Sequence, residues 1–201
     1  MEPSAEKTVK AIRALNPHRL LIIGGTEHNS PSALQHIKLY EDEAILYTFH
    51  CYAPFEFTHQ QGVLQTAPLY YNRKMEYPSD DIDRYRDYLH LLGKEDPYGQ
   101  MQRMDIEYLR QYLAPAKKFL QQHPDKALWC GEFGTIRHCN ITYRENRMRD
   151  MITILKEWGI AYSVWNYLST PNDGNRFSLV DDDNRQILSE KMGRIIRGEI
   201  G

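Results

Sequence analysis

The segment ALWCGEFG at residues 127–134 gives the first indication of what the chain is built for. Its apolar residues lead into one carboxylate, Glu132, with Gly131 before it and Gly134 two residues after it. A short apolar run bounded by glycines is typical of a buried strand whose C-terminal end opens into a loop. Glutamate is seldom buried without a partner, whereas functional groups gather at the C-terminal ends of strands in α/β sheets. Glu132 is therefore the first candidate for a catalytic side chain.

Composition indicates one soluble globular domain. The chain has 201 residues, of which 41% are hydrophobic and 26% charged, and its formal net charge is -2. This charge favours neither a nucleic acid nor an anionic membrane as partner, so we expect neither. No apolar run approaches the roughly 18 residues that span a bilayer. Residues 1–10 lack the apolar core of a signal peptide, and the compartment stays open.

The sequence gives no motif for a cofactor or a metal. Its three cysteines, Cys51, Cys130 and Cys139, form no CxxC motif or Cys/His cluster. The glycine pair at residues 24–25 is not part of a phosphate-binding loop, and no GxSxG segment occurs. We therefore expect no cofactor, no metal site and three buried, unreactive thiols.

Hydrophobic periodicity divides the chain into alternating helices and strands. Helices are predicted over residues 4–16, 105–122, 143–158 and 188–197, with one or two helical turns over 31–39. Strands are predicted over residues 19–25, 44–52, 127–134 and 160–167. A long loop at about 53–100, irregular over 55–98, is interpreted as a cover over a binding site, and a helix is considered near 81–92. Strands and helices that alternate at this spacing indicate βαβ units and a parallel sheet.

Four side chains fall at or near the predicted strand ends: His50, Tyr52, Glu132 and Trp165. Each has an ordinary explanation by itself, because a histidine or tyrosine there is more often a satisfied core residue and a tryptophan more often packs the core. Their occurrence together favours a site. A carboxylate nucleophile, an imidazole and a phenol that position it, and an indole that stacks on a sugar ring fit cleavage of a glycosidic bond.

These segments resemble glycoside hydrolase family 5, the cellulase-type retaining enzymes with a (β/α)8 TIM-barrel fold. The resemblance covers nearly the whole chain and rests on RLLIIGG at 19–25, HNSP at 28–31, FHCYAPFEFTHQ at 49–60, WCGEFG at 129–134 and VWNY at 164–167. It implies an α/β fold and an endoglucanase-type activity on β-1,4-glucan.

The resemblance also assigns roles to individual residues. It implies that Glu132 is the nucleophile, that His50 and Tyr52 flank it, and that Trp165 lines the sugar subsite next to the cleaved bond. It further implies that three more residues bind the substrate, namely Asn29, Phe55 and His59.

Only the second half of the family's barrel has a counterpart in this sequence. Residues 1–201 are expected to form a single partial catalytic domain, with the fifth to eighth strands and the fourth to eighth helices of the barrel. The family's acid/base glutamate lies in the preceding half. Met1-Glu2-Pro3 resembles its Asn-Glu-Pro motif, which would make Glu2 the acid/base. Against this assignment, no strand precedes Glu2, and only 10 residues, 3–12, separate it from Arg13, about half the family's usual spacing.

Three functional hypotheses follow. A retaining glycosidase needs two carboxyl groups, so the first is hydrolysis of O-glycosyl bonds in a β-glucan, impaired in this chain alone. The second is a non-catalytic, sugar-binding or self-associating half-barrel, and the third is a folded remnant without function. Because half a barrel leaves strand edges unpaired, we expect a homo-oligomer. The polysaccharide, and whether cleavage is endo or exo, stay open.

Overall fold

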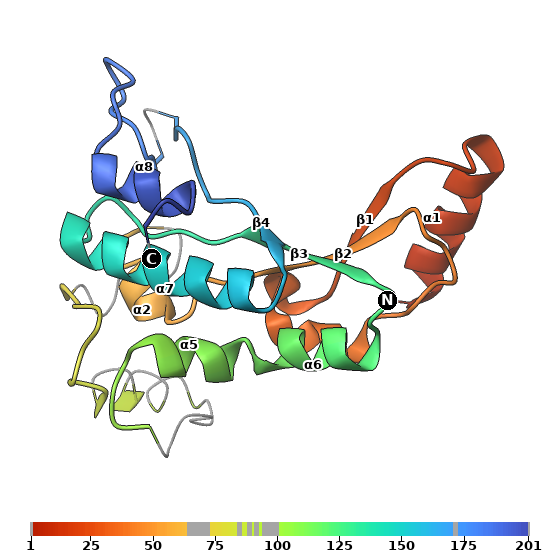
Figure 1. The fold of residues 1–201 in the computed structure, drawn as a ribbon, viewed down its shortest axis with the longest axis horizontal. Coiled ribbons are helices and arrows are strands. Elements are labelled where there is room, and N and C mark those ends of the chain that lie inside the picture. Colours follow the sequence, from red (N-terminus) through yellow and green to blue (C-terminus); the bar gives the residue numbers. More distant parts are fainter. Residues whose placement is uncertain are drawn as a thin grey trace.

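A parallel sheet of four strands forms the centre of the chain, in the order β1-β2-β3-β4 (Figure 1). The computed structural model describes residues 2–63, 73–83, 86, 87, 90, 93, 101–170 and 173–200. The strands are Leu21–Gly24 (β1), Ile45–His50 (β2), Ala127–Glu132 (β3) and Ala161–Tyr162 (β4). They follow one another in chain order, as in a (β/α) barrel, whereas a doubly wound sheet reverses its order. The predicted α/β class with a parallel sheet is confirmed.

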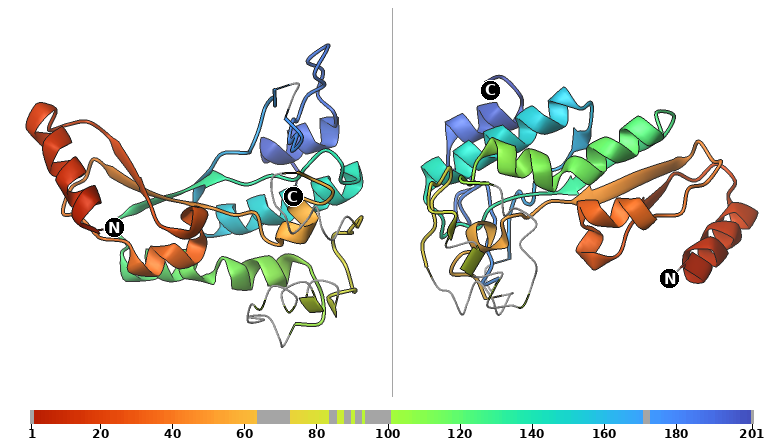
Figure 2. Two further views of the ribbon diagram at one scale, coloured as in Figure 1. Left: turned by 180° about the vertical axis from the view of Figure 1, so that it is seen from behind. Right: turned by 90° about the horizontal axis from the view of Figure 1, so that it is seen from below.

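Helices cover one face of this sheet. The α-helices whose bounds lie within the described residues are Glu2–Leu15 (α1), Phe55–Thr58 (α2), Ile106–Tyr112 (α5), Ala114–Gln122 (α6), Ile141–Glu157 (α7) and Glu190–Ile196 (α8). Two 3-10 helices, Glu27–Asn29 (η1) and Pro31–His36 (η2), follow β1. Helices α5, α6, α7 and α8 lie on the same side of the strands (Figure 2). Among the helices of the described ranges, none is long and apolar enough to cross a membrane.

Strand β2 shows how the sheet separates the core from the site. Tyr47, Phe49 and Cys51 alternate along the strand and its end, and all three are fully buried. The Tyr47 ring lies 5.3 Å from the Phe119 ring of α6, and Cys51 Sγ lies 3.8 Å from the Met151 sulfur of α7. Successive side chains of a strand point to opposite faces. The intervening Thr48 and His50 therefore face away from the helices.

The predicted helix over 105–122 is wrong in one respect, because the structure divides it into α5 and α6 at Leu113. Pro115 lies in the first turn of α6. Proline has no N–H to donate, and its ring clashes with the carbonyl four residues earlier, so one continuous helix cannot pass through it. The side chain of Asp105 begins α5 by accepting a 2.9 Å hydrogen bond from the backbone N–H of Glu107.

Two further boundaries differ from the prediction. The strand predicted over 160–167 is shorter in the structure, where β4 covers Ala161 and Tyr162. Beyond it the backbone N–H groups of Ser163 and Trp165 still donate to the carbonyls of Cys130 and Phe133. Part of the region predicted as irregular, 55–98, forms the short helix α2. Of the described residues of the helix considered near 81–92, residues 83, 86, 87 and 90 are helical, whereas 81 and 82 are not. Residues 84, 85, 88, 89, 91 and 92 of that prediction, together with 64–72 and 94–100 of the long loop, lie outside the described residues.

The opposite edge of the sheet is open. In the described sheet β1 pairs only with β2, and α1 lies beyond it at one end of the molecule (Figures 1 and 2). Ion pairs of 2.6 Å tie α1 to the segments before β2, from Glu6 to Lys38 and from Arg13 to Asp42. Large apolar side chains are exposed here, with Leu20 59% and Ile22 52% accessible.

Candidate active site

A cleft of about 710 Å³ lies at the C-terminal ends of the strands. Every residue singled out from the sequence lines it except Glu2, namely Asn29, His50, Tyr52, Phe55, His59, Glu132 and Trp165. They come from the last residues of β2 and β3 and from the segments that follow β1, β2 and β4, which parallel pairing brings to one edge of the sheet. Glu2 is the first residue of α1, and its side chain lies outside the described part of the structure.

Glu132 has two polar neighbours from β2 and its extension, and one of them is hydrogen-bonded to it. The Tyr52 hydroxyl donates a 2.9 Å hydrogen bond to Glu132 Oε2, and His50 Nδ1 lies 3.6 Å from the same oxygen. The Glu132 side chain is 29% exposed, so it is shielded by protein yet open to the cleft. A carboxylate in this setting is oriented by its neighbours and still accessible to a ligand.

The glycines around Glu132 are explained by close approaches from both neighbouring strands. A Cβ at Gly131 would lie 2.8 Å from Thr48 Oγ1 of β2. A Cβ at Gly134 would collide with the carbonyl oxygen of Trp165, which follows β4. The residue pairing skips Gly131, so that Phe49 lies opposite Cys130 and His50 opposite Glu132. A bulge of this kind re-aims side chains at the end of a strand.

Burial keeps the two neighbours of Glu132 neutral. Burial, together with the charge of Glu132 and the hydrogen bond to it, raises the pKa of Tyr52 well above its ordinary value of 10. Burial also lowers the pKa of His50, although the nearby Glu132 charge acts in the opposite direction. At neutral pH Tyr52 is therefore a hydrogen-bond donor and His50 an uncharged imidazole.

An aromatic wall forms one side of the cleft. The ring of His59 stacks on Phe55 at a centroid distance of 4.2 Å and an interplanar angle of 12°. Its edge meets Tyr52 at 5.2 Å and Phe177 at 5.0 Å. Burial first, and then the positive charge of Arg147, lower the pKa of His59 to about 3. His59 thus contributes an uncharged, rigid surface.

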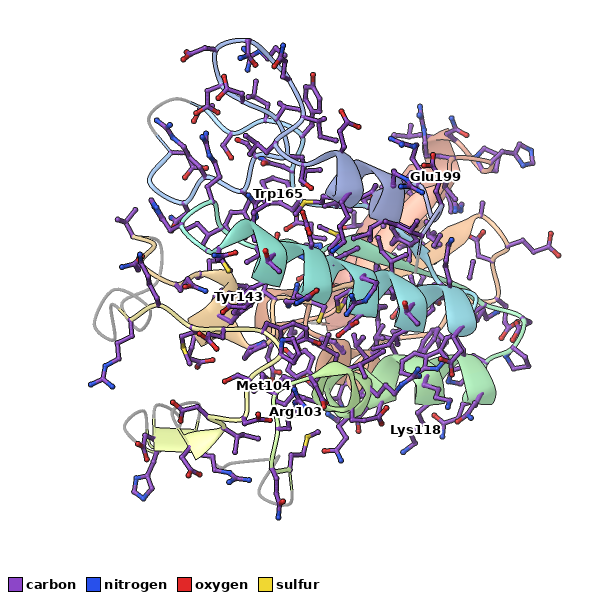
Figure 3. All side chains as sticks on the ribbon, turned by 60° about the vertical axis from the view of Figure 1, so that its left-hand side comes forward. Arg103, Met104, Lys118, Tyr143, Trp165 and Glu199 are labelled. Atoms are coloured by element: carbon purple, nitrogen blue, oxygen red, sulfur yellow. The ribbon has the colours of Figure 1, made fainter. Side chains whose placement is uncertain are left out.

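The remaining two predicted residues lie on opposite sides of the cleft. Glu27, His28 and Asn29 after β1 all have positive φ, and Asn29 Oδ1 accepts a 2.9 Å hydrogen bond from the backbone N–H of Gly25. Trp165, after β4, is 43% exposed and lies among the loops above α7 in Figure 3. The peptide bond between Trp165 and Asn166 is cis.

Several lining residues carried no sequence signal that singled them out: Glu27, His28, Ser30, Tyr112, Asp173, Asn175 and Phe177. His28 and Ser30 lie within the HNSP motif, so the motif did point to their segment. The others come from loops or helices whose path across the cleft is set by tertiary packing. Asn175 illustrates this, because its Oδ1 accepts a 2.8 Å hydrogen bond from the backbone N–H of Val63, 112 positions away.

Comparison with known proteins identifies the family to which this chain is similar. The family model Cellulase (glycosyl hydrolase family 5) matches residues 1–170. Endoglucanase C of Acetivibrio thermocellus and Endoglucanase C307 of a Clostridium species are each 32% identical over 194 residues, which cover 94% of this chain and 54% of theirs. A hyperthermophilic endo-beta-1,4-glucanase solved with substrate has a TM-score of 0.71 at 22% identity, over 96% of this chain and 52% of that one. The chain spans about half the length of the relatives it matches.

The lowered pKa of His59 predicts a specific pH dependence of stability. The folded-state pKa of about 3 lies below the ordinary value of 6.5, so protons bind the unfolded chain more tightly. The free energy of unfolding should therefore fall as the pH decreases from about 6.5 towards 3, by up to about 1.4 kcal/mol per pH unit from this group. His59→Gln should show a shallower decline in urea titrations at several pH values. The exposed His138→Gln is the control, and parallel curves for all three proteins would contradict the prediction.

Proposed function

The chain belongs to the cellulase family, glycosyl hydrolase family 5, and from this membership we propose that it hydrolyses the O-glycosyl bonds of β-1,4-glucans. In this proposal the chain is an endoglucanase-type retaining glycosidase, and Glu132 is its nucleophile. The observation that carries the proposal is the 2.9 Å hydrogen bond from the Tyr52 hydroxyl to Glu132 Oε2 in the cleft. The relatives named endoglucanase support the substrate class.

Each side chain has a role in this mechanism. Glu132 attacks the anomeric carbon while the glycosidic C–O bond breaks and the leaving group departs with the bonding electrons and takes up a proton. Water then hydrolyses the covalent glycosyl-enzyme, which frees the sugar and restores the carboxylate. Tyr52 orients the attacking carboxylate through its hydrogen bond, and His50 stands beside the same oxygen. Trp165 offers an exposed indole face to a sugar ring, while Asn29, Phe55 and His59 line the substrate path.

Departure of the leaving group requires a second carboxyl group. Among the described residues two other carboxylates line the cleft, and both interact with their own loops. Glu27 Oε2 accepts hydrogen bonds from Ser30 and Ser32, and Asp173 Oδ1 accepts one from the backbone N–H of Asn175. General acid catalysis contributes typically 10²–10⁴-fold. We therefore propose that this chain alone cleaves a glucan with its ordinary sugar leaving group slowly, and reacts faster when the leaving group needs no proton.

Replacement of the nucleophile tests this mechanism. We expect the chain to release dinitrophenol from dinitrophenyl cellobioside. With the fluorinated analogue of this substrate, we expect a covalent adduct at Glu132 that mass spectrometry detects. The rate of dinitrophenol release should be at least about 100-fold lower in Glu132→Gln, because the amide is not a nucleophile. The matched control is Glu157→Gln, whose carboxylate pairs with Arg110 on the helix layer. Equal release by Glu132→Gln and the parent chain would remove Glu132 from the mechanism.

A second candidate function is sugar binding without bond cleavage. The exposed Trp165 favours it, because an accessible indole at a cleft stacks on a sugar ring whether or not the bond is broken.

Calorimetry with cellotetraose separates the two functions when the same samples are assayed for products. Trp165→Ala should weaken binding by about tenfold or more, since the stacked surface is lost. Tyr167→Ala is the control, because Tyr167 is 64% exposed and does not line the cleft. Binding with no product from any activated or natural substrate would support the second function. If Trp165→Ala binds cellotetraose as tightly as the parent chain does, the role of Trp165 in both proposed functions is contradicted.

We also propose that copies of the chain associate through the open edge at β1. The exposed Leu20 and Ile22 and the unpaired side of β1 in the described sheet support this association, because such an edge can pair with another strand. Ile22→Lys should shift light scattering towards the monomer, and Ile141→Lys, at a 37% exposed site at the start of α7, should not. A monodisperse monomer of the parent chain with cooperative melting would overturn the proposal.

A further inference from the structure

Arg147, in the middle of α7, is a buried cation. Its side chain is 1% exposed. All of its oxygen acceptors within the described residues are backbone carbonyls: those of Cys51 at 3.1 Å, Ala53 at 2.8 Å and Gly134 at 3.3 Å. A buried charge is costly unless it is well compensated. Here three carbonyl dipoles take the place of a carboxylate.

The three carbonyls belong to the two segments that carry the reacting pair. Cys51 and Ala53 are the residues on either side of Tyr52, and Gly134 lies two residues after Glu132. The guanidinium group donates through Nη2 and Nε to the first segment and through Nη1 to the second. One planar group therefore joins the end of β2 to the end of β3 from behind the cleft.

We propose that Arg147 is a positioning residue, whose guanidinium sets the distance between these two segments so that the Tyr52 hydroxyl can donate to Glu132. The planar fork matters more than the charge, because a lysine ammonium is a single point and cannot donate to carbonyls on both segments in fixed directions. The effect on catalysis rests on the proposed function, whereas the effect on the hydrogen bond does not.

The same helix offers a matched control. Arg144, one turn earlier, is 4% exposed and also donates to backbone carbonyls, those of Phe177 and Ser178. Those carbonyls lie in the loop before α8 and not at the ends of β2 and β3, although the Phe177 ring contacts the Tyr52 ring at a centroid distance of 5.8 Å. A substitution at Arg144 thus removes a comparable buried arginine without releasing the two segments that carry Tyr52 and Glu132.

The test compares Arg147→Lys and Arg147→Gln with Arg144→Lys and the parent chain. The first readout is the proton NMR signal of the Tyr52 hydroxyl, which a hydrogen bond to a carboxylate protects from exchange and which is assigned by its absence in Tyr52→Phe. The second is the rate of adduct formation at Glu132 with the fluorinated dinitrophenyl cellobioside. Melting temperatures report how much each substitution destabilises the fold.

The Arg147 variants should lose the hydroxyl signal and form the adduct at least about tenfold more slowly, because small displacements of reacting groups are costly. Arg144→Lys should keep both while its melting temperature falls. A folded Arg147 variant that keeps the hydroxyl signal and the parent's rate of adduct formation would overturn the proposal. The proposal would also be overturned if neither Arg147 variant folds while Arg144→Lys does. If the parent forms no adduct, the proposed function fails, and the hydroxyl signal still decides the role of Arg147.

Discussion

The parallel pairing of β2 with β3 is the constraint on which the site depends. At its C-terminal end the backbone N–H of Cys51 donates a 2.8 Å hydrogen bond to the carbonyl of Glu132. This bond continues the pairing past the bulge at Gly131 and sets Tyr52 beside the carboxylate. A shift of one residue would turn Glu132 towards the opposite face of the sheet, because side chains alternate along a strand.

Close packing around this pairing leaves room for few side-chain types. Because Gly131 and Gly134 have no side chain, the Thr48 side chain of β2 and the backbone of Trp165, which follows β4, can approach them closely. The helix layer closes the opposite face of β2 through fully buried Tyr47 and Phe49. The site therefore lies between a packed core and an open face, an arrangement that combines an oriented carboxylate with access from the cleft.

Much of the candidate site was predictable from the sequence, because strand ends are local features. An apolar run that stops at a glycine marks where a strand ends, and a polar residue there has few structural explanations, as with Glu132. Tertiary features were less accessible. The division of the helix over 105–122 was signalled by Pro115 yet missed. Phe177 and Asp173 reach the cleft from a loop whose path depends on packing over the whole domain.

By itself the sequence determined the parallel α/β order and the family, since periodicity and short motifs are properties of neighbouring residues. Only the tertiary structure decided that Tyr52 donates to Glu132 while His59 stacks on Phe55. It also decided that Arg147 lies behind both strand ends. These contacts join residues up to 96 positions apart, and their geometry follows from strand register and helix packing, which local patterns do not encode.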